Sequence, residues 1–293
     1  MNHTEADPLN KTFIIGIVLN LLFVATECFY GLLTGSMGLL SDAGHNLGDV
    51  TSLILAMMAF RLAKVKATKN YTYGYKKGTI LVSLTNAILL IIAVIFIIKE
   101  SICKLFNPVE SSSLGETVIW VAAVGIVVNG VTAWLFMKDK GKDLNVRGAF
   151  LHMSADTLVS ASVVVSGVII KFTGLSIIDP IIGLIIAIVV IISTWSLLSK
   201  SIRLAIDGVP SNVNLDRILK YILSVEGVKE CHHLHIWAIS TTENALTAHI
   251  VINDIKAMEQ IKEQIKRSLN EMGIPHATLE IESMESHCCK TCR

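Results

Sequence analysis

The chain has 293 residues, of which 52% are hydrophobic and 17% are charged, and its mean hydropathy is +0.61. That composition is too apolar for a soluble protein of this length. The formal net charge is only +1, and the basic residues gather in short segments between apolar runs, so composition gives no reason to expect a nucleic-acid partner.

Six apolar runs precede residue 200, and each has about 19 or more residues, enough to cross a bilayer core of about 30 Å. The segment 1–11 before them is polar and has no basic cluster, so we do not expect a cleaved signal peptide. Asp179 and Pro180 have the residue types of an N-cap and a first helical position, which predicts the start of the sixth helix. We predict six transmembrane helices, at Thr12–Thr34, Met37–Phe60, Gly78–Ile98, Thr117–Met137, Gly148–Ile170 and Ile181–Ser199.

The loops between the runs differ in charge, and lysine and arginine favour the cytoplasmic side of a membrane. Basic residues are concentrated in the loops after the second and fourth runs: Arg61, Lys64, Lys66, Lys69, Lys76 and Lys77 in one, and Lys138, Lys140, Lys142 and Arg147 in the other. This pattern predicts a multi-pass protein with both termini in the cytoplasm, in a bacterial inner membrane or an equivalent cell or organelle membrane.

Two of the apolar runs carry the same pair of ionisable residues. His45 and Asp49 are four residues apart in the second run, as are His152 and Asp156 in the fifth. Residues four apart share one face of an α-helix, and a carboxylate inside a span costs about 2.5–3.5 kcal/mol unless it has a partner. Two imidazoles and two carboxylates suit a tetrahedral cation such as Zn²⁺. The alternative is that these groups only bond to each other or to backbone carbonyls.

Protons and metal would compete for these four side chains, because only neutral imidazole and ionised carboxylate bind a cation. Imidazole titrates near about pH 6.5 when unperturbed, so a pH gradient can favour loading on one side of the membrane and release on the other. Glu27 in the first run is open to two interpretations. It can serve proton movement or metal entry, or it can be a carboxylate that is hydrogen-bonded inside the bundle.

Beyond residue 207 the apolar content is too interrupted to span a membrane. Periodicity predicts helices at Leu215–Val225 and Ile255–Met272, and strands at Cys231–Ser240, Ala245–Asn253 and His276–Ser283. The order αββαβ predicts a small cytoplasmic α+β domain of the ferredoxin-like kind. Its small core favours pairing with a second copy or with metal. The expected divisions are a cytoplasmic segment 1–11, a transmembrane domain 12–207, a metal-binding domain 208–283 and a Cys/His-rich tail 284–293.

Strand alternation predicts that His232 faces one side of its strand, while His233 and His235 face the other, which we expect to be solvated. The tail holds a second group of metal-binding residue types, His287, Cys288, Cys289 and Cys292. Thiols stay reduced in the cytoplasm, so a weak zinc or copper site is a better hypothesis for them than disulfides. An unliganded tail is the competing interpretation.

Five stretches together resemble the cation diffusion facilitator family: SMGLLSDAGHNLGD, YTYGYKK, RGAFLHMSAD, GVKECHHLHIWAIS and HATLEIE. The likeness covers almost the whole chain. It implies a homodimer, joined through the cytoplasmic domain and the membrane helices, that exports Zn²⁺ in exchange for protons by alternating access. His45, Asp49, His152 and Asp156 would form the intramembrane site, with the ligand set of the zinc-preferring branch.

The resemblance also implies a zinc site in the cytoplasmic domain that modulates transport, formed by His232, His249, Glu280 and Glu282. Some relatives have His and Asp at the two positions where this chain has Glu. Residues 61–77 include no His, Asp or Glu, so a further site that some relatives have in this loop is expected to be absent. Lys77 and Asp207 stand at positions that resemble an interlocking ion pair of the dimer.

Two other classes of function were weighed against transport. An intramembrane metallohydrolase needs a general base beside its zinc ligands and an open coordination position, but the chain has no His-Glu-x-x-His motif and offers four protein ligands. A membrane-anchored metal sensor would need only the cytoplasmic cluster, not buried ligands in the spans. We therefore expect a transporter and not an enzyme.

Overall fold

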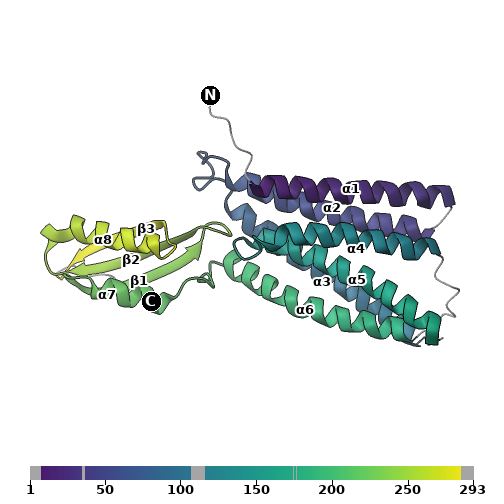
Figure 1. Cartoon of the computed structure of the whole chain (residues 1–293). Helices are drawn as coiled ribbons and strands as arrows, with labels where there is room; N and C mark the ends of the chain where they lie inside the picture. The colour runs from purple at the N-terminus through teal and green to yellow at the C-terminus, as the bar shows by residue number, and fades with distance from the viewer. Residues whose placement is uncertain (1–7, 35–36, 107–115, 174, 176, 285–293) are drawn as a thin grey trace, which may run out of the picture.

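A computed structural model describes residues 8–34, 37–106, 116–173, 175 and 177–284. Six long helices form a bundle, and a small sheet domain extends from one end of it (Figure 1). The helices are α1 (Pro8–Thr34), α2 (Met37–Ala63), α3 (Lys77–Phe106), α4 (Glu116–Met137), α5 (Leu144–Thr173) and α6 (Ile178–Ala205).

The bundle helices have the length and composition of membrane spans. Within the described residues, five of them are long and apolar enough to cross a membrane, and α4 contributes a shorter apolar segment, Ala123–Met137. The helices pack mainly in pairs, α1 on α2, α3 on α6 and α4 on α5. Phe13, Leu53, Phe136 and Met153 form a buried cluster between them, whereas many large apolar side chains point outward, as expected of helices that face lipid.

Polar side chains inside the bundle are paired between helices. The Asn20 amide donates to Thr132 Oγ1 at 3.2 Å, and Ser52 Oγ donates to Asn86 Oδ1 at 3.2 Å. Such bonds satisfy groups that would otherwise be costly in an apolar interior.

The start of α6 differs from the prediction. The helix begins at Ile178 with Ile177 as its N-cap residue, so Asp179 is in the first turn. The Asp179 carboxylate accepts from Ser166 Oγ at 2.8 Å and lies 3.3 Å from Lys104 Nζ. Asp179 therefore links α6 to α5 and α3, and these tertiary partners take the place of the expected capping bond.

The sheet domain has the predicted order of elements. They are α7 (Leu215–Ser224), β1 (Val228–Ala238), β2 (Asn244–Ile252), a 3₁₀ turn η1 (Ile255–Ala257), α8 (Met258–Glu271) and β3 (His276–Ser283). The strand order is β1-β2-β3, with β1 antiparallel and β3 parallel to β2. Both helices cover one face, because Ile222, Ile250 and Ile265 share one buried cluster. Alternate residues of the strands therefore face away from the helices.

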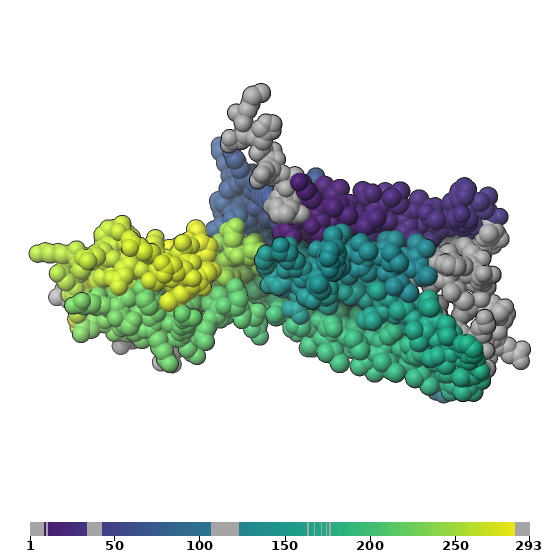
Figure 2. All heavy atoms as spheres, in the orientation of Figure 1, coloured from purple at the N-terminus to yellow at the C-terminus, as the bar shows by residue number. Residues whose placement is uncertain are grey.

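Several polar contacts join the bundle to the sheet domain, which lie end to end (Figure 2). Lys77 Nζ is 2.5 Å from Asp207 Oδ1 and also approaches the carbonyl oxygens of Leu204 at 3.3 Å and Ala238 at 3.4 Å. Lys76 Nζ is 2.6 Å from Glu243 Oε2. The first residue of α3 thus contacts the ends of α6 and β1, and the loop residue before it contacts the turn between β1 and β2.

Candidate functional site

Two neighbouring helices, α2 and α5, each bring one His-x-x-x-Asp pair to the same place in the bundle. His45 and Asp49 are one turn apart on α2, and His152 and Asp156 are one turn apart on α5. With about 1.5 Å of rise per residue, each pair lies more than two turns from either end of its helix. The sites therefore fall well within the length that spans a membrane.

The closest contacts join a histidine of one helix to an aspartate of the other. His152 Nε2 is 2.6 Å from Asp49 Oδ1, and His45 Nε2 is 3.9 Å from Asp156 Oδ1. His152 Nε2 is also 3.7 Å from Asp156 Oδ2. One ligand atom from each of His45, Asp49 and Asp156 lies within 4.8 Å of the others. The structure thus brings all four predicted side chains into contact, but His152 is not one of the three whose ligand atoms converge.

Because these side chains are buried, keeping both carboxylates ionised costs free energy unless a cation or protons balance their charge. The exposed fraction of the side chain is 3% for Asp49 and 11% for His152, but 57% for His45. Asp49 Oδ2, His152 Nδ1 and Asp156 Oδ2 are buried without a hydrogen-bond partner. Two buried carboxylates repel each other unless positive charge lies between them. A dication, or protons on the imidazoles and carboxylates, supplies that charge.

The Asp49–His152 bond also matches the alternative hypothesis, in which these residues only bond to each other. The contact is compatible with both interpretations. When no metal is present, the imidazole and the carboxylate satisfy each other. The same atoms are also available to a cation once the imidazole is neutral and the carboxylate ionised.

Glu27 is hydrogen-bonded inside the bundle, as one of its two interpretations expected. Asn46 Nδ2 donates to Glu27 Oε2 at 2.8 Å, and both residues are buried. Asn46 follows His45 directly, so this bond ties α1 to the part of α2 that carries the ligands. Sequence reasoning missed Asn46. Its only signal was its place beside a ligand histidine.

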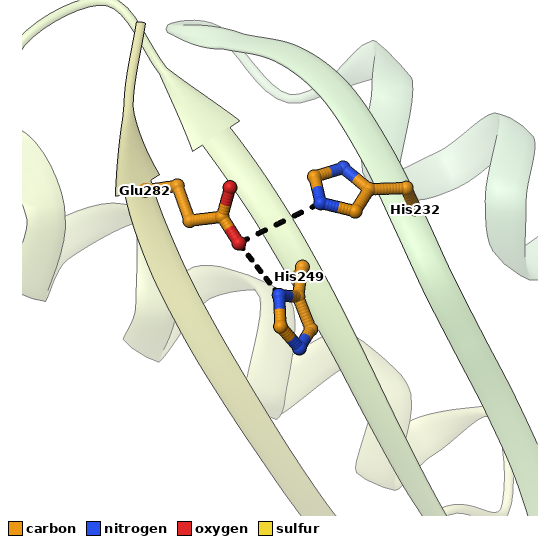
Figure 3. A group of neighbouring side chains, drawn as sticks. All are labelled: His232, His249 and Glu282. Carbon is orange, nitrogen blue, oxygen red and sulfur yellow. Dashed lines mark hydrogen bonds and ion pairs between the residues drawn. The ribbon is translucent and has the colours of Figure 1, made fainter. Parts of the chain in front are cut away.

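A second group of ligands lies on the sheet face that the helices leave uncovered (Figure 3). His232, His249 and Glu282 have ligand atoms within 4.8 Å of one another. Glu282 Oε1 is 2.6 Å from His249 Nδ1 and 3.5 Å from His232 Nε2. Glu280 Oε2 lies 3.4 Å from the other ring nitrogen of His249, Nε2. The register explains the convergence, because His249 pairs with both His232 and Glu280.

The predicted alternation along β1 is wrong at His233 and His235. The register shifts between His232 and His235, where three steps along β1 match two along β2. This β-bulge adds one residue and changes which side chains share a face. The His233 ring centroid lies 5.1 Å from that of His249 and 6.5 Å from that of His235. His233 therefore belongs to the face of the ligand group and not to the opposite one.

Cys231, directly before His232, is not part of this group. Its side chain packs against the buried cluster on the other face of the sheet. Burial, together with the neighbouring Glu230 carboxylate, raises the pKa of the Cys231 thiol to about 11. The thiol is protonated at neutral pH and is therefore a poor metal ligand. The tail residues His287, Cys288, Cys289 and Cys292 lie outside the described residues, so their metal site stays a prediction.

Two family comparisons cover this arrangement. Residues 13–204 match the cation efflux transmembrane domain, and residues 210–284 match the cytoplasmic domain of cation efflux proteins. A "Cadmium, cobalt and zinc/H(+)-K(+) antiporter" of Bacillus subtilis is 36% identical, over 98% of this chain and 93% of its own. The "Metal cation efflux system protein CzcD" of Cupriavidus metallidurans is 34% identical, over 96% and 89%. The "Zinc transporter ZitB" of Pectobacterium atrosepticum is 31% identical, over 98% and 91%.

Proposed function

We propose that this chain, which belongs to the cation efflux family of multi-pass membrane transporters, exports Zn²⁺ from the cytoplasm in exchange for protons. Members of the family move metal cations and are not enzymes, and two of the relatives above are named for zinc, one of them also for cadmium and cobalt. The proposal adds the preferred ion, the residues that hold it and the exchange with protons.

The observation that carries the proposal is the crossed pairing of His45 with Asp156 and of Asp49 with His152. Two imidazoles and two carboxylates from two helices form one group, which is the ligand set expected for Zn²⁺. With these four protein ligands on a tetrahedral ion, no coordination position would be left for a reacting water. That arrangement fits binding and release rather than hydrolysis.

Proton exchange follows from the chemistry of the same side chains. A cation entering from the cytoplasm displaces the protons of the imidazoles and separates the Asp49–His152 pair. Opening toward a more acidic compartment returns protons to the ligands and frees the ion. Alternating access requires that α2 and α5 open to only one side at a time. His45 is the most exposed of the four side chains.

The sheet domain is proposed to hold modulatory zinc at His232, His249 and Glu282, with Glu280 beside them, and to pair with a second copy of the chain. Its small core supports pairing. The contacts of Lys76 and Lys77 with Glu243 and Asp207 offer a route from this domain to the bundle. The same cluster supports a metal sensor as second candidate, but a sensor has no use for the buried ligands of α2 and α5.

Both termini are proposed to be cytoplasmic. An even number of spans places them on one side, and α1 starts at the end of the bundle that carries the sheet domain (Figure 1). The basic residues of the α2–α3 and α4–α5 loops also lie at that end, in agreement with the charge rule for cytoplasmic loops.

The test is zinc uptake by proteoliposomes that contain the purified full-length protein, driven by an inside-acidic pH gradient. The wild type should accumulate Zn²⁺ and release protons, and Asp49→Ala and Asp156→Ala should reduce uptake to the level of empty vesicles. Glu271→Gln, at an exposed position of α8, is the matched control. Uptake that persists in both aspartate variants contradicts the proposed site. Competition by Cd²⁺ and Co²⁺ in the wild type measures the preference.

A further inference from the structure

The β1 bulge holds His233 in an unusual backbone conformation. Its φ angle is +48°, in the left-handed region that residues other than glycine seldom adopt. Such a conformation persists only where the surrounding structure imposes it, and it is often found at functional sites. The bulge turns His233 toward the partly buried rings of His232 and His249 instead of leaving it on the far face of the strand.

The three rings form an almost equilateral triangle. Their centroids are 5.2 Å apart for His232 and His233, 5.1 Å for His233 and His249, and 5.3 Å for His232 and His249. With Zn–N bonds of about 2.1 Å, each centroid lies about 3.2 Å from the ion, so two imidazoles on one tetrahedral zinc have centroids about 5.2 Å apart. The three observed separations all fall at this spacing.

We propose that His233 is a ligand of the cytoplasmic site, which then consists of three imidazoles, from His232, His233 and His249, and the Glu282 carboxylate. This inference rests on the proposed function, since it specifies the site assigned there to modulatory zinc. The ligand atoms of His232, His249 and Glu282 already converge. Rotation of the His233 ring about its Cβ–Cγ bond brings a nitrogen toward them and leaves its centroid nearly in place.

The ring nitrogens of the flanking histidines indicate where the ion sits. His249 directs Nδ1 toward Glu282 and Nε2 toward Glu280. His232 directs Nε2 toward Glu282, while its Nδ1 lies 3.9 Å from Glu230 Oε1. Both nitrogens of His232 are buried and lack a hydrogen-bond partner. An ion at Glu282 would thus take one nitrogen from each ring, and the outward nitrogens face the Glu280 and Glu230 carboxylates.

This geometry gives Glu280 and Glu230 a different role from Glu282. The two nitrogens of one imidazole point apart, so an ion bound to His249 Nδ1 is out of reach of a carboxylate at Nε2. Glu280 and Glu230 instead lie beside the outward nitrogens, at 3.4 Å and 3.9 Å, where their charge favours ring orientations that turn the other nitrogen toward the ion. A site of three imidazoles and one carboxylate suits Zn²⁺ or Co²⁺ and disfavours Mg²⁺ or Ca²⁺.

The test uses the full-length protein in detergent, with Asp49 and Asp156 replaced by alanine and the three tail cysteines by serine, so that the cytoplasmic site is measured alone. His233→Asn removes the imidazole but keeps a residue that tolerates positive φ. His235→Asn is the matched control, because His235 is an exposed histidine of the same strand. Zn²⁺ affinity comes from competition with a chelating dye, and the number of imidazoles per zinc from X-ray absorption at the zinc edge.

We expect three imidazoles per zinc in the background protein and two in His233→Asn, with affinity at least about tenfold weaker and no change in His235→Asn. The same count and affinity in His233→Asn would overturn the inference. Thermal unfolding without metal checks that His233→Asn is folded. If it is not, the same zinc measurements are made on His233→Gly, because glycine also adopts positive φ. Proton-driven uptake by protein with Asp49 and Asp156 intact is measured separately, so failure of the transport proposal is distinguishable from failure of this one.

Discussion

The Asp49 carboxylate and the His152 imidazole lie 2.6 Å apart, although 103 residues separate them in the chain. The bond joins α2 to α5, and the second His-x-x-x-Asp partner on each helix lies one turn away. Any movement that separates the two helices breaks this contact and divides the ligand set. Binding of an ion by the proposed ligands would therefore be coupled to the relative position of the two helices.

Exchanging the two partners tests their contact. Asp49→His alone places two imidazoles side by side, and His152→Asp alone places two carboxylates side by side. Because like groups repel each other and the ligand set changes, each single variant should lower zinc uptake at least about tenfold. The double variant restores one imidazole and one carboxylate and should regain part of the uptake. Initial rates in proteoliposomes measure this. A folded double variant no more active than either single variant would contradict direct contact.

Zinc affinity of the intramembrane group should rise with pH. Protonated imidazole cannot bind a cation, so lowering the pH from about 8 to about 6, through the range in which imidazole usually titrates, should weaken binding. Isothermal titration of the full-length protein, with His232, His249 and Glu282 replaced by alanine, in two buffers of different ionisation enthalpy also counts the protons that the intramembrane group releases. Affinity that is independent of pH would rule out exchange at these ligands.

Glu27→Gln and Glu27→Ala separate the two roles weighed for this residue. If Glu27 only accepts the Asn46 hydrogen bond, glutamine keeps the acceptor and uptake should stay within about twofold of the wild type. Alanine leaves the buried Asn46 amide without its partner, which should cost about 1–3 kcal/mol in unfolding free energy. Loss of uptake in a stable Glu27→Gln protein would instead assign proton movement to Glu27.

Replacing Lys77 should weaken the junction between the bundle and the sheet domain more than replacing Asp207 does. The ion pair between them is largely exposed, so Asp207→Asn, which tolerates the positive φ at this position, should change unfolding free energy by less than about 1 kcal/mol. Lys77→Met also removes the donor to the Leu204 and Ala238 carbonyls. It should speed proteolysis of the 208–214 connection, and equal cleavage rates in both variants would argue against this bridging role.

The Cys231 thiol should react slowly at neutral pH. Because burial and Glu230 raise its pKa to about 11, only a very small fraction is thiolate at pH 7, and alkylation should accelerate as the pH approaches that value. Peptide mass spectrometry after iodoacetamide treatment measures the rate at each cysteine, and the exposed Cys103 is the internal reference. Rapid labelling of Cys231 at pH 7 would contradict the buried position.

The sequence alone determined the features that depend on local geometry. A run of apolar residues long enough for a bilayer identifies a span, and His45 with Asp49 share a helix face because four residues make about one turn. The order of elements in the sheet domain followed from periodicity in the same way. These predictions hold because each depends on residues close together in the chain.

Only the tertiary structure decided how distant residues meet. Packing of α2 on α5 paired each histidine with the aspartate of the other helix, and Ser166 and Lys104 took the Asp179 carboxylate from its expected capping position. The β1 bulge, which depends on pairing with β2, brought His233 to the ligand face. Simple alternation could not predict it, because one extra residue in a strand reverses the face of every side chain beyond it.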